Sequence, residues 1–260
     1  MKKLALWSFS AAAMMLFNGC ALWQNDCQKI QQPAVTAVKA AAGDIIFDGE
    51  ADEKFWQKVP AYDLVRCDIS HTLPPREKAA ILKDGLEKGQ VKFAYDDKYF
   101  YAAAVLQDND IVAVSPAAYQ FLGDCFKIVL TQEDAVFGWN FISVPNGMGV
   151  ALCSYPDGLY QTYKEQKNYG KLDGFEIKCK LKGTLNMQDD RDKGWSTEMR
   201  IPLTALAQKG MVPQDANKWR ILAVRMNYSA YNYFVQSSVF PRQAAFNFYL
   251  REYFSPVIFR

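Results

Sequence analysis

The sequence predicts an all-β protein, an antiparallel β-sandwich with short helices. From residue 44 onward, short alternating or apolar runs are separated by turn residues, which is typical of a sandwich and not of alternating strands and helices. Half of the residues are hydrophobic, enough to bury a full-sized core. Only residues 75–87 and 203–209 read as helical, and both stretches are short.

The expected strands follow one another from residue 90 onward. Residues 90–95 and 99–106 flank an acidic turn and predict a hairpin. Residues 124–131 place Phe126, Ile128 and Leu130 on one face, which predicts a half-buried strand. Asn146-Gly147 supplies the positive φ angles of a tight hairpin. The remaining expected strands are residues 137–144, 148–155, 175–181, 194–201 and 219–228.

The N-terminus has the layout of a secretory signal. Lys2 and Lys3 precede an apolar run over residues 4–17 that is shorter than the roughly 20 residues of a membrane-spanning helix. Residues 16–20 resemble a bacterial lipobox, whose cysteine carries the lipid, although an ordinary signal peptide with an incidental cysteine is the alternative. We therefore expect lipidation of Cys20 and a membrane-anchored lipoprotein of the cell envelope, on its periplasmic or extracellular face.

Three regions follow from these patterns. Residues 1–20 are the signal peptide with its lipobox, and residues 21–43 read as a flexible tether because they are polar and small without a periodic apolar face. Residues 44–260 read as one sandwich domain. Beyond Cys20 the chain has five cysteines at irregular spacing, which predicts at most one or two disulfides and at least one free thiol.

The charge pattern argues against nucleic acid as a partner. The chain has 30 basic and 28 acidic residues, and the basic ones are scattered rather than gathered in a stripe. Lys178, Lys180 and Lys182 alternate on one strand, which we interpret as a solvated strand surface.

Several segments together resemble family 9 carbohydrate-binding modules. Residues 46–56, with the sequence Ile-Phe-Asp-Gly-Glu-Ala-Asp-Glu-Lys-Phe-Trp, are similar to the opening of that family. The other similar blocks are residues 95–101 with 108–110, 123–130, 194–203 and 253–259. The resemblance implies an immunoglobulin-like or jelly-roll-like sandwich over residues 44–260. Related domains of this DOMON-like type bind sugars, and some bind haem.

Most residues of these blocks have an expected structural role. Asp48-Gly49 reads as a turn, and Trp56 reads as part of the core, because buried aromatic side chains are usual inside sandwiches. We expect Glu198 to pair with an arginine or to cap backbone N–H groups rather than to act as an acid.

The resemblance also implies where a sugar would bind. In the family, two tryptophans clamp the ligand, one before the central strand and one after the strand at residues 219–228. Here the first position has Tyr119 and Phe121, and the second has Tyr231, Tyr233 and Gln236. Neither position has tryptophan, but tyrosine and phenylalanine can stack on sugars. Alternatively, these rings fill the end of the sandwich. Nearby candidates at the second position are Tyr228, Asn232 and Phe240.

We therefore expect a non-catalytic lipoprotein that binds a polysaccharide or oligosaccharide by aromatic stacking. One alternative is a protein-interaction or structural subunit of a surface assembly. Another is a haem-binding domain that uses His71, or Met226 with Met199, as axial ligands.

Catalysis and cofactors have little support in the sequence. The chain has one histidine, and the carboxylate pairs that would suit a glycosidase are Glu198 with Asp124 or Asp173. We expect no cofactor. Calcium is left open at the acidic turns 96–97 and 108–110, where ordinary turn chemistry explains the same residues.

Overall fold

The structure is a computed structural model, and the elements below all belong to one compact unit, Gln32–Arg260. Within this unit the structure describes residues 32–67, 74–83, 85–113, 123–133, 138–154, 172–208, 210–211, 218–230, 235–243 and 251–260.

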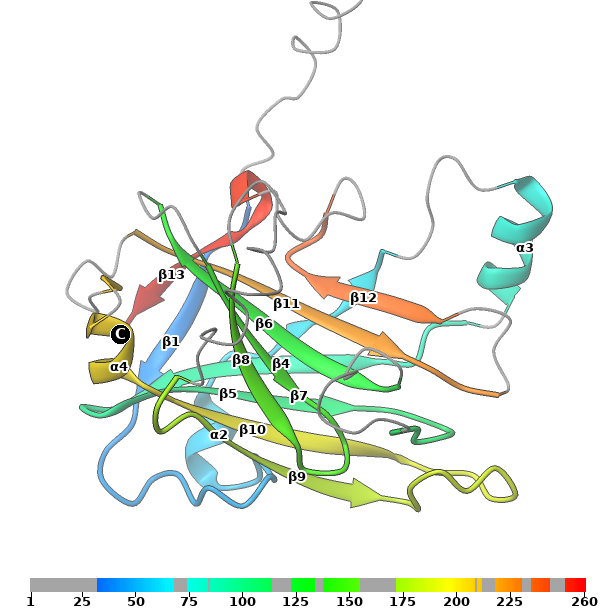
Figure 1. The fold of residues 1–260 in the computed structure, drawn as a ribbon, viewed down its shortest axis with the longest axis horizontal. Coiled ribbons are helices and arrows are strands. Elements are labelled where there is room, and N and C mark those ends of the chain that lie inside the picture. Colours follow the sequence, from blue (N-terminus) through cyan, green and yellow to red (C-terminus); the bar gives the residue numbers. More distant parts are fainter. Residues whose placement is uncertain are drawn as a thin grey trace, which may run out of the picture. The chain divides into compact units, whose positions relative to one another are not determined.

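Two layers of strands form the sandwich (Figure 1). The first layer contains, in order, β9 (Glu176–Lys182), β10 (Gly194–Pro202), β5 (Tyr99–Leu106), β4 (Gly89–Tyr95) and β2 (Tyr62–Asp63). The second layer contains β8 (Gly149–Ser154), β7 (Gly138–Ser143), β6 (Cys125–Gln132), β11 (Trp219–Asn227), β12 (Gln236–Phe240) and β3 (Val65–Arg66). Strands β13 (Ser255–Phe259) and β1 (Val35–Lys39) connect the two layers. The predicted all-β sandwich is therefore confirmed.

Strand β1 corrects the predicted tether. It lies between β13 and β4 and pairs with both in parallel, with Val35 opposite Val257 and Ala37 opposite Phe93. Val35 and Ala37 are fully buried. The prediction that residues 21–43 are a flexible tether is wrong for this strand, and the sandwich begins at Gln32 rather than at residue 44. A five-residue strand buried by neighbours distant in sequence shows no local period.

The main core fills the space between the layers. The first layer contributes Phe93, Phe100, Leu106, Trp195 and Met199, and the second contributes Phe126, Ile128, Leu130, Phe141 and Ile221. Phe126, Ile128 and Leu130 of β6 point into this core, as the alternation in residues 124–131 predicts. The prediction of a half-buried strand is wrong, however, because Val129 on the opposite face is also buried, against Leu222, Val224 and Val239.

The short helices lie near their predicted positions. Helix α3 (Pro75–Lys83) and helix α4 (Leu203–Gln208) end before residues 87 and 209, the predicted ends. Helix α2 (Lys54–Lys58) was not predicted, and a 3₁₀ turn, η4, covers Arg251–Tyr253. Among the described residues, no helix combines the length and apolar character needed to cross a bilayer.

Among the cysteines that the structure describes, Cys125 and Cys179 are free thiols. The prediction of at least one free thiol is confirmed by these residues. Cys20, the predicted lipidation site, and Cys27 lie outside the described residues.

Candidate functional site

The residues predicted to bind a ligand lie mostly on two loops. Tyr119 and Phe121 belong to the first loop, residues 107–124 between β5 and β6. Tyr231 and Tyr233 belong to the second loop, residues 228–235 between β11 and β12. All four of these side chains lie outside the described residues. The structure describes the residues at the base of each loop, which we call the stems. They are residues 107–113 and 123–124 of the first loop and residues 228–230 and 235 of the second loop.

The stems of the two loops lie side by side. Strands β6 and β11 are antiparallel neighbours, and Cys125 at the start of β6 pairs with Met226 near the end of β11. The first loop therefore ends beside the point where the second loop begins. An isolated bridge between Ala113 and Gly123 closes the first loop at its base.

Two buried carboxylates of the first loop bind the backbone of the second. Asp124 accepts a hydrogen bond from the Val112 N–H through Oδ2 and from the Tyr228 N–H through Oδ1, both at 2.6 Å. Asp110 accepts the Ala230 N–H through Oδ2 at 2.8 Å. Its other oxygen, Oδ1, is buried without a hydrogen-bond partner among the described residues. Side chains of one loop thus fix the position of the other.

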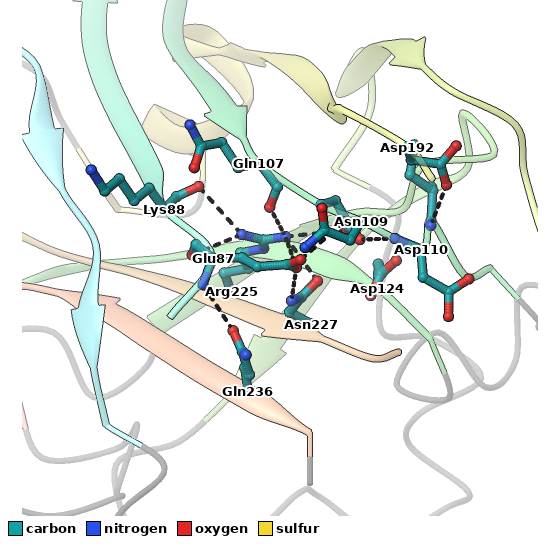
Figure 2. Close-up of polar contacts among 12 residues, drawn as sticks. Glu87, Lys88, Gln107, Asn109, Asp110, Asp124, Asp192, Arg225, Asn227 and Gln236 are labelled. Carbon is teal, nitrogen blue, oxygen red and sulfur yellow. Dashed lines mark hydrogen bonds and ion pairs between the residues drawn. The ribbon is translucent and has the colours of Figure 1, made fainter. Parts of the chain in front are cut away.

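Arg225 is the centre of a buried polar cluster behind the stems (Figure 2). Its Nη2 donates to the Gln107 carbonyl at 2.6 Å, to Asn227 Oδ1 at 2.8 Å and to Asp108 Oδ2 at 3.2 Å. Its Nη1 donates to the Glu87 carbonyl at 3.2 Å. The guanidinium is only 1% exposed, and a buried charge of this kind requires such partners.

Glu87 connects this cluster to the first loop and to β12. Its carboxylate accepts the Asn227 side-chain amide at 2.6 Å and the Asn109 N–H at 3.0 Å. The Glu87 N–H in turn donates to Gln236 Oε1 at 3.0 Å. The segment before β4 is therefore part of the support of both loops.

Burial dominates the electrostatics of the two neighbouring aspartates. It raises the pKa of Asp108 to about 6, partly offset by the nearby Arg225 guanidinium. Burial, followed by repulsion from Asp108, also raises the pKa of Asp124 well above its usual range. These shifts follow from removing carboxylates from water.

A second pair of contacts attaches the first loop to the segment between β9 and β10. Asp192 accepts the Ile111 N–H through Oδ2 and the Thr184 N–H through Oδ1, both at 2.7 Å. Asn186, which has a φ of 59°, exchanges side-chain hydrogen bonds with the backbone of Ala113. The first loop is therefore held on both of its sides.

The described residues of the second predicted position have other roles. Gln236 is 3% exposed, and its amide binds the Gly85 carbonyl and the Glu87 N–H, each at 3.0 Å. Both ends of this amide thus have partners in the chain, and its role in ligand binding stays a prediction. Phe240, a nearby candidate at this position, lies in β12, and the centre of its ring is 4.8 Å from that of Tyr62. Tyr228 is half-buried beside Asp124.

The structural roles predicted for the family-like blocks are confirmed. Trp56 is fully buried against Ala94, Tyr101 and Ala103. Glu198 caps backbone, since its Oε2 accepts the N–H groups of Asp48 at 3.0 Å and Gly49 at 2.9 Å. The lysines that alternate on β9 are exposed, as expected of a solvated strand surface.

The carboxylates considered for catalysis have separate surroundings in the structure. Glu198 lies on the outer face of β10 and binds residues 48 and 49, whereas Asp124 holds the loop stems beside β11. Asp173 is exposed in a turn before β9.

The described residues that were considered as ligands of haem or calcium have other roles in the structure. His71 lies outside it. Met199 belongs to the main core, whereas Met226 packs against the clusters on the outer face of the second layer. Asp96 is used in its turn, where Oδ1 accepts the N–H groups of Lys98 and Tyr99. No group of three or more acidic, histidine or cysteine residues among those described has the arrangement of a metal site.

Solved structures are similar to this sandwich. A family 9 carbohydrate-binding module from Caldicellulosiruptor kristjanssonii, in complex with cellotriose, matches with a TM-score of 0.54 at 14% identity, over 87% of this chain and 93% of that chain. Its complex with glucose matches with a TM-score of 0.53 at 14% identity, over 87% and 95% of the two chains. A candidate carbohydrate-binding protein from Bacteroides uniformis matches with a TM-score of 0.60 at 13% identity, over 88% and 99%.

The likeness extends over nearly the whole length of these proteins, and the fold is that of a family 9 carbohydrate-binding module. The resemblance inferred from the sequence blocks is confirmed at this level. No protein family and no curated protein matches the sequence itself.

Sequence reasoning missed the buried cluster around Arg225. Arg225 has the same phase along β11 as Ile221 and Ala223, both of which face the core. A charged residue at a strand position that faces the core is the signal that could have revealed this cluster, because such a residue needs buried partners. Asp108 and Asp110 were noted as turn residues and Asp124 as the first residue of a strand, but the N–H groups of Ala230 and Tyr228 that bind Asp110 and Asp124 lie far away in the sequence.

Proposed function

We propose that this chain is a non-catalytic carbohydrate-binding protein whose ligand binds at the end of the sandwich where the first and second loops begin. The observation that carries the proposal is the register of β6 and β11, which brings the stems of both loops together. The fold supports the same conclusion, because structures of the same fold hold cellotriose and glucose.

The proposed mode of binding is aromatic stacking. Sugars present weakly polar C–H faces ringed by hydroxyl groups, and an aromatic ring offers a matching apolar face. Tyr119 and Phe121 on the first loop, and Tyr231 and Tyr233 on the second, are the proposed stacking residues. They start from stems that Asp124 and Asp110 hold together, so one ligand can contact both loops.

We also propose that the protein works as a lipoprotein of the cell envelope, anchored through Cys20. A diacylated cysteine anchors a protein stably on a bilayer, because each buried methylene contributes about 0.8 kcal/mol and two chains act together. Such an anchor suits a binding protein that keeps a glycan near the cell.

A glycan array followed by calorimetry tests the proposal. We expect binding to a defined set of glycans and an affinity at least tenfold lower, or about 1.4 kcal/mol, in Tyr119→Ala and in Tyr231→Ala. Phe47→Ala is the matched control, because this half-buried ring packs over Arg200 on the outer face of β10, away from the loops. The absence of binding to any glycan, together with co-purification of a protein partner, would overturn the proposal in favour of an interaction subunit.

A further inference from the structure

We propose that Asp124 is a positioning residue that joins the two loops into one binding unit, an inference that rests on the proposed function. Asp124 is fully buried, and the side chains predicted to contact sugar lie on the loops that it holds. It would therefore act on the ligand through the loops.

The two side-chain hydrogen bonds of Asp124 to backbone N–H groups divide evenly between the two loops. Oδ2 binds Val112 in the first loop, and Oδ1 binds Tyr228 at the start of the second. The Asp124 N–H also donates to the Val112 carbonyl at 2.7 Å, so these two residues hold each other. The Asp124 carboxylate therefore joins Val112 in the first stem to Tyr228 in the second.

Asp124 itself sits on a rigid support. It immediately precedes β6, whose pairing with β11 runs from Cys125 to Gln132. Behind it, Arg225 fixes Asp108 at 3.2 Å and Asn227 at 2.8 Å. Asp110 adds a second contact in the same direction, to Ala230.

This arrangement has a consequence for binding. A site formed by two separate loops loses affinity when each loop must be ordered by the ligand, and it gains affinity when the loops are already held in place. Because the Asp124 carboxylate binds both stems, its loss should loosen both stems at Val112 and Tyr228.

Asp192 provides a matched control for the experiment. Like Asp124, it is a buried carboxylate whose two oxygens each accept one backbone N–H from separate segments, at 2.7 Å. It joins the first loop to Thr184, however, and not to the second loop. Asp124→Asn and Asp192→Asn each replace one oxygen that accepts a backbone N–H by an N–H₂ donor, at two different places.

The first measurement needs no sugar. Amide hydrogen exchange of the full chain should show protection at least tenfold lower at both Val112 and Tyr228 in Asp124→Asn. In Asp192→Asn the loss should fall on Ile111 and Thr184, with Tyr228 within threefold of wild type. Loss at only one of Val112 and Tyr228 in Asp124→Asn would overturn the inference, even if no glycan ligand is found.

The second measurement uses a glycan identified on the array. We expect Asp124→Asn to bind it at least tenfold more weakly and Asp192→Asn less than threefold more weakly, when both variants are equally folded. Loosened stems with unchanged affinity would refute the positioning role while leaving carbohydrate binding intact. If Asp124→Asn does not fold, hydrogen exchange of the wild type still tests the inference. The backbone amides of Val112 and Tyr228 should exchange with the same opening constant at each concentration of a denaturant series. Unequal opening constants would reject the inference.

Discussion

Glu198 should make the folded protein less stable as the pH rises through neutrality. Burial raises the pKa of this carboxyl from 4.5 to about 7, although the N–H groups of Gly49 and Asp48 oppose the change. The folded protein therefore holds a proton that the unfolded chain releases. Stability from this group is complete below about pH 4.5 and is lost as the pH rises through 7, because ionisation is easier in the unfolded state.

The size of the effect follows from the two pKa values. At about 1.4 kcal/mol per pH unit, the difference between 4.5 and about 7 corresponds to roughly 3 kcal/mol. The substitution Glu198→Gln isolates this contribution, since the amide oxygen can still accept the N–H groups of Asp48 and Gly49 but does not titrate. Relative to wild type, the variant should gain about 3 kcal/mol in free energy of unfolding between pH 4.5 and pH 8.5.

Urea denaturation of both proteins at the two pH values measures this difference. Comparison with wild type removes the contribution of the other buried carboxyls, including Asp108 and Asp124, whose pKa values are also raised. Glu198→Ala serves as a control that loses the backbone cap at every pH. A difference between wild type and Glu198→Gln that is the same at both pH values would refute the reasoning.

Three further predictions concern stability. Arg225→Met should cost at least about 3 kcal/mol in urea denaturation, because Asp108 and its neighbours would be buried without their cation, and a loss below 1 kcal/mol would contradict this. Gly49→Ala should lower the free energy of unfolding by about 3 kcal/mol, since φ is 102° and a Cβ would lie 2.9 Å from the Cys179 backbone. Gly43→Ala, with φ of 87° in open space, should cost only about 1 kcal/mol, and equal losses would count against the steric argument. Deletion of residues 1–43 should abolish cooperative thermal unfolding, measured by circular dichroism, because β1 would be lost from between β13 and β4. An unchanged melting curve would show instead that these residues act as the predicted tether.

The sequence allowed the strands with a clear period of two to be predicted. Phe126, Ile128 and Leu130 alternate with side chains of the other face, and the structure places them together in the main core. The role of Glu198 was also predictable, because it lies in a block whose order and spacing resemble a known family.

The parts that failed depend on contacts between distant segments. The five residues of β1 lie in an alanine-rich stretch, and they form a strand because β13 and β4 offer open edges on both sides. The site shows the same limit, since Asp124 reads locally as the first residue of a strand. Its partner Tyr228 is 104 positions away, and only the pairing of β6 with β11 brings the two together.

The placement of β1 has a consequence for how the protein presents its loops. Gln32, just before β1, donates a hydrogen bond to the Arg242 carbonyl at 3.2 Å, and Ser255 at the start of β13 pairs with Ile221. From Ile221 to Asn227, β11 runs roughly 20 Å toward the loop stems. The described chain thus enters the sandwich near the level of Ile221, and the hydrogen bonds that hold the loop stems lie farther along β11, at Arg225, Asn227 and Tyr228.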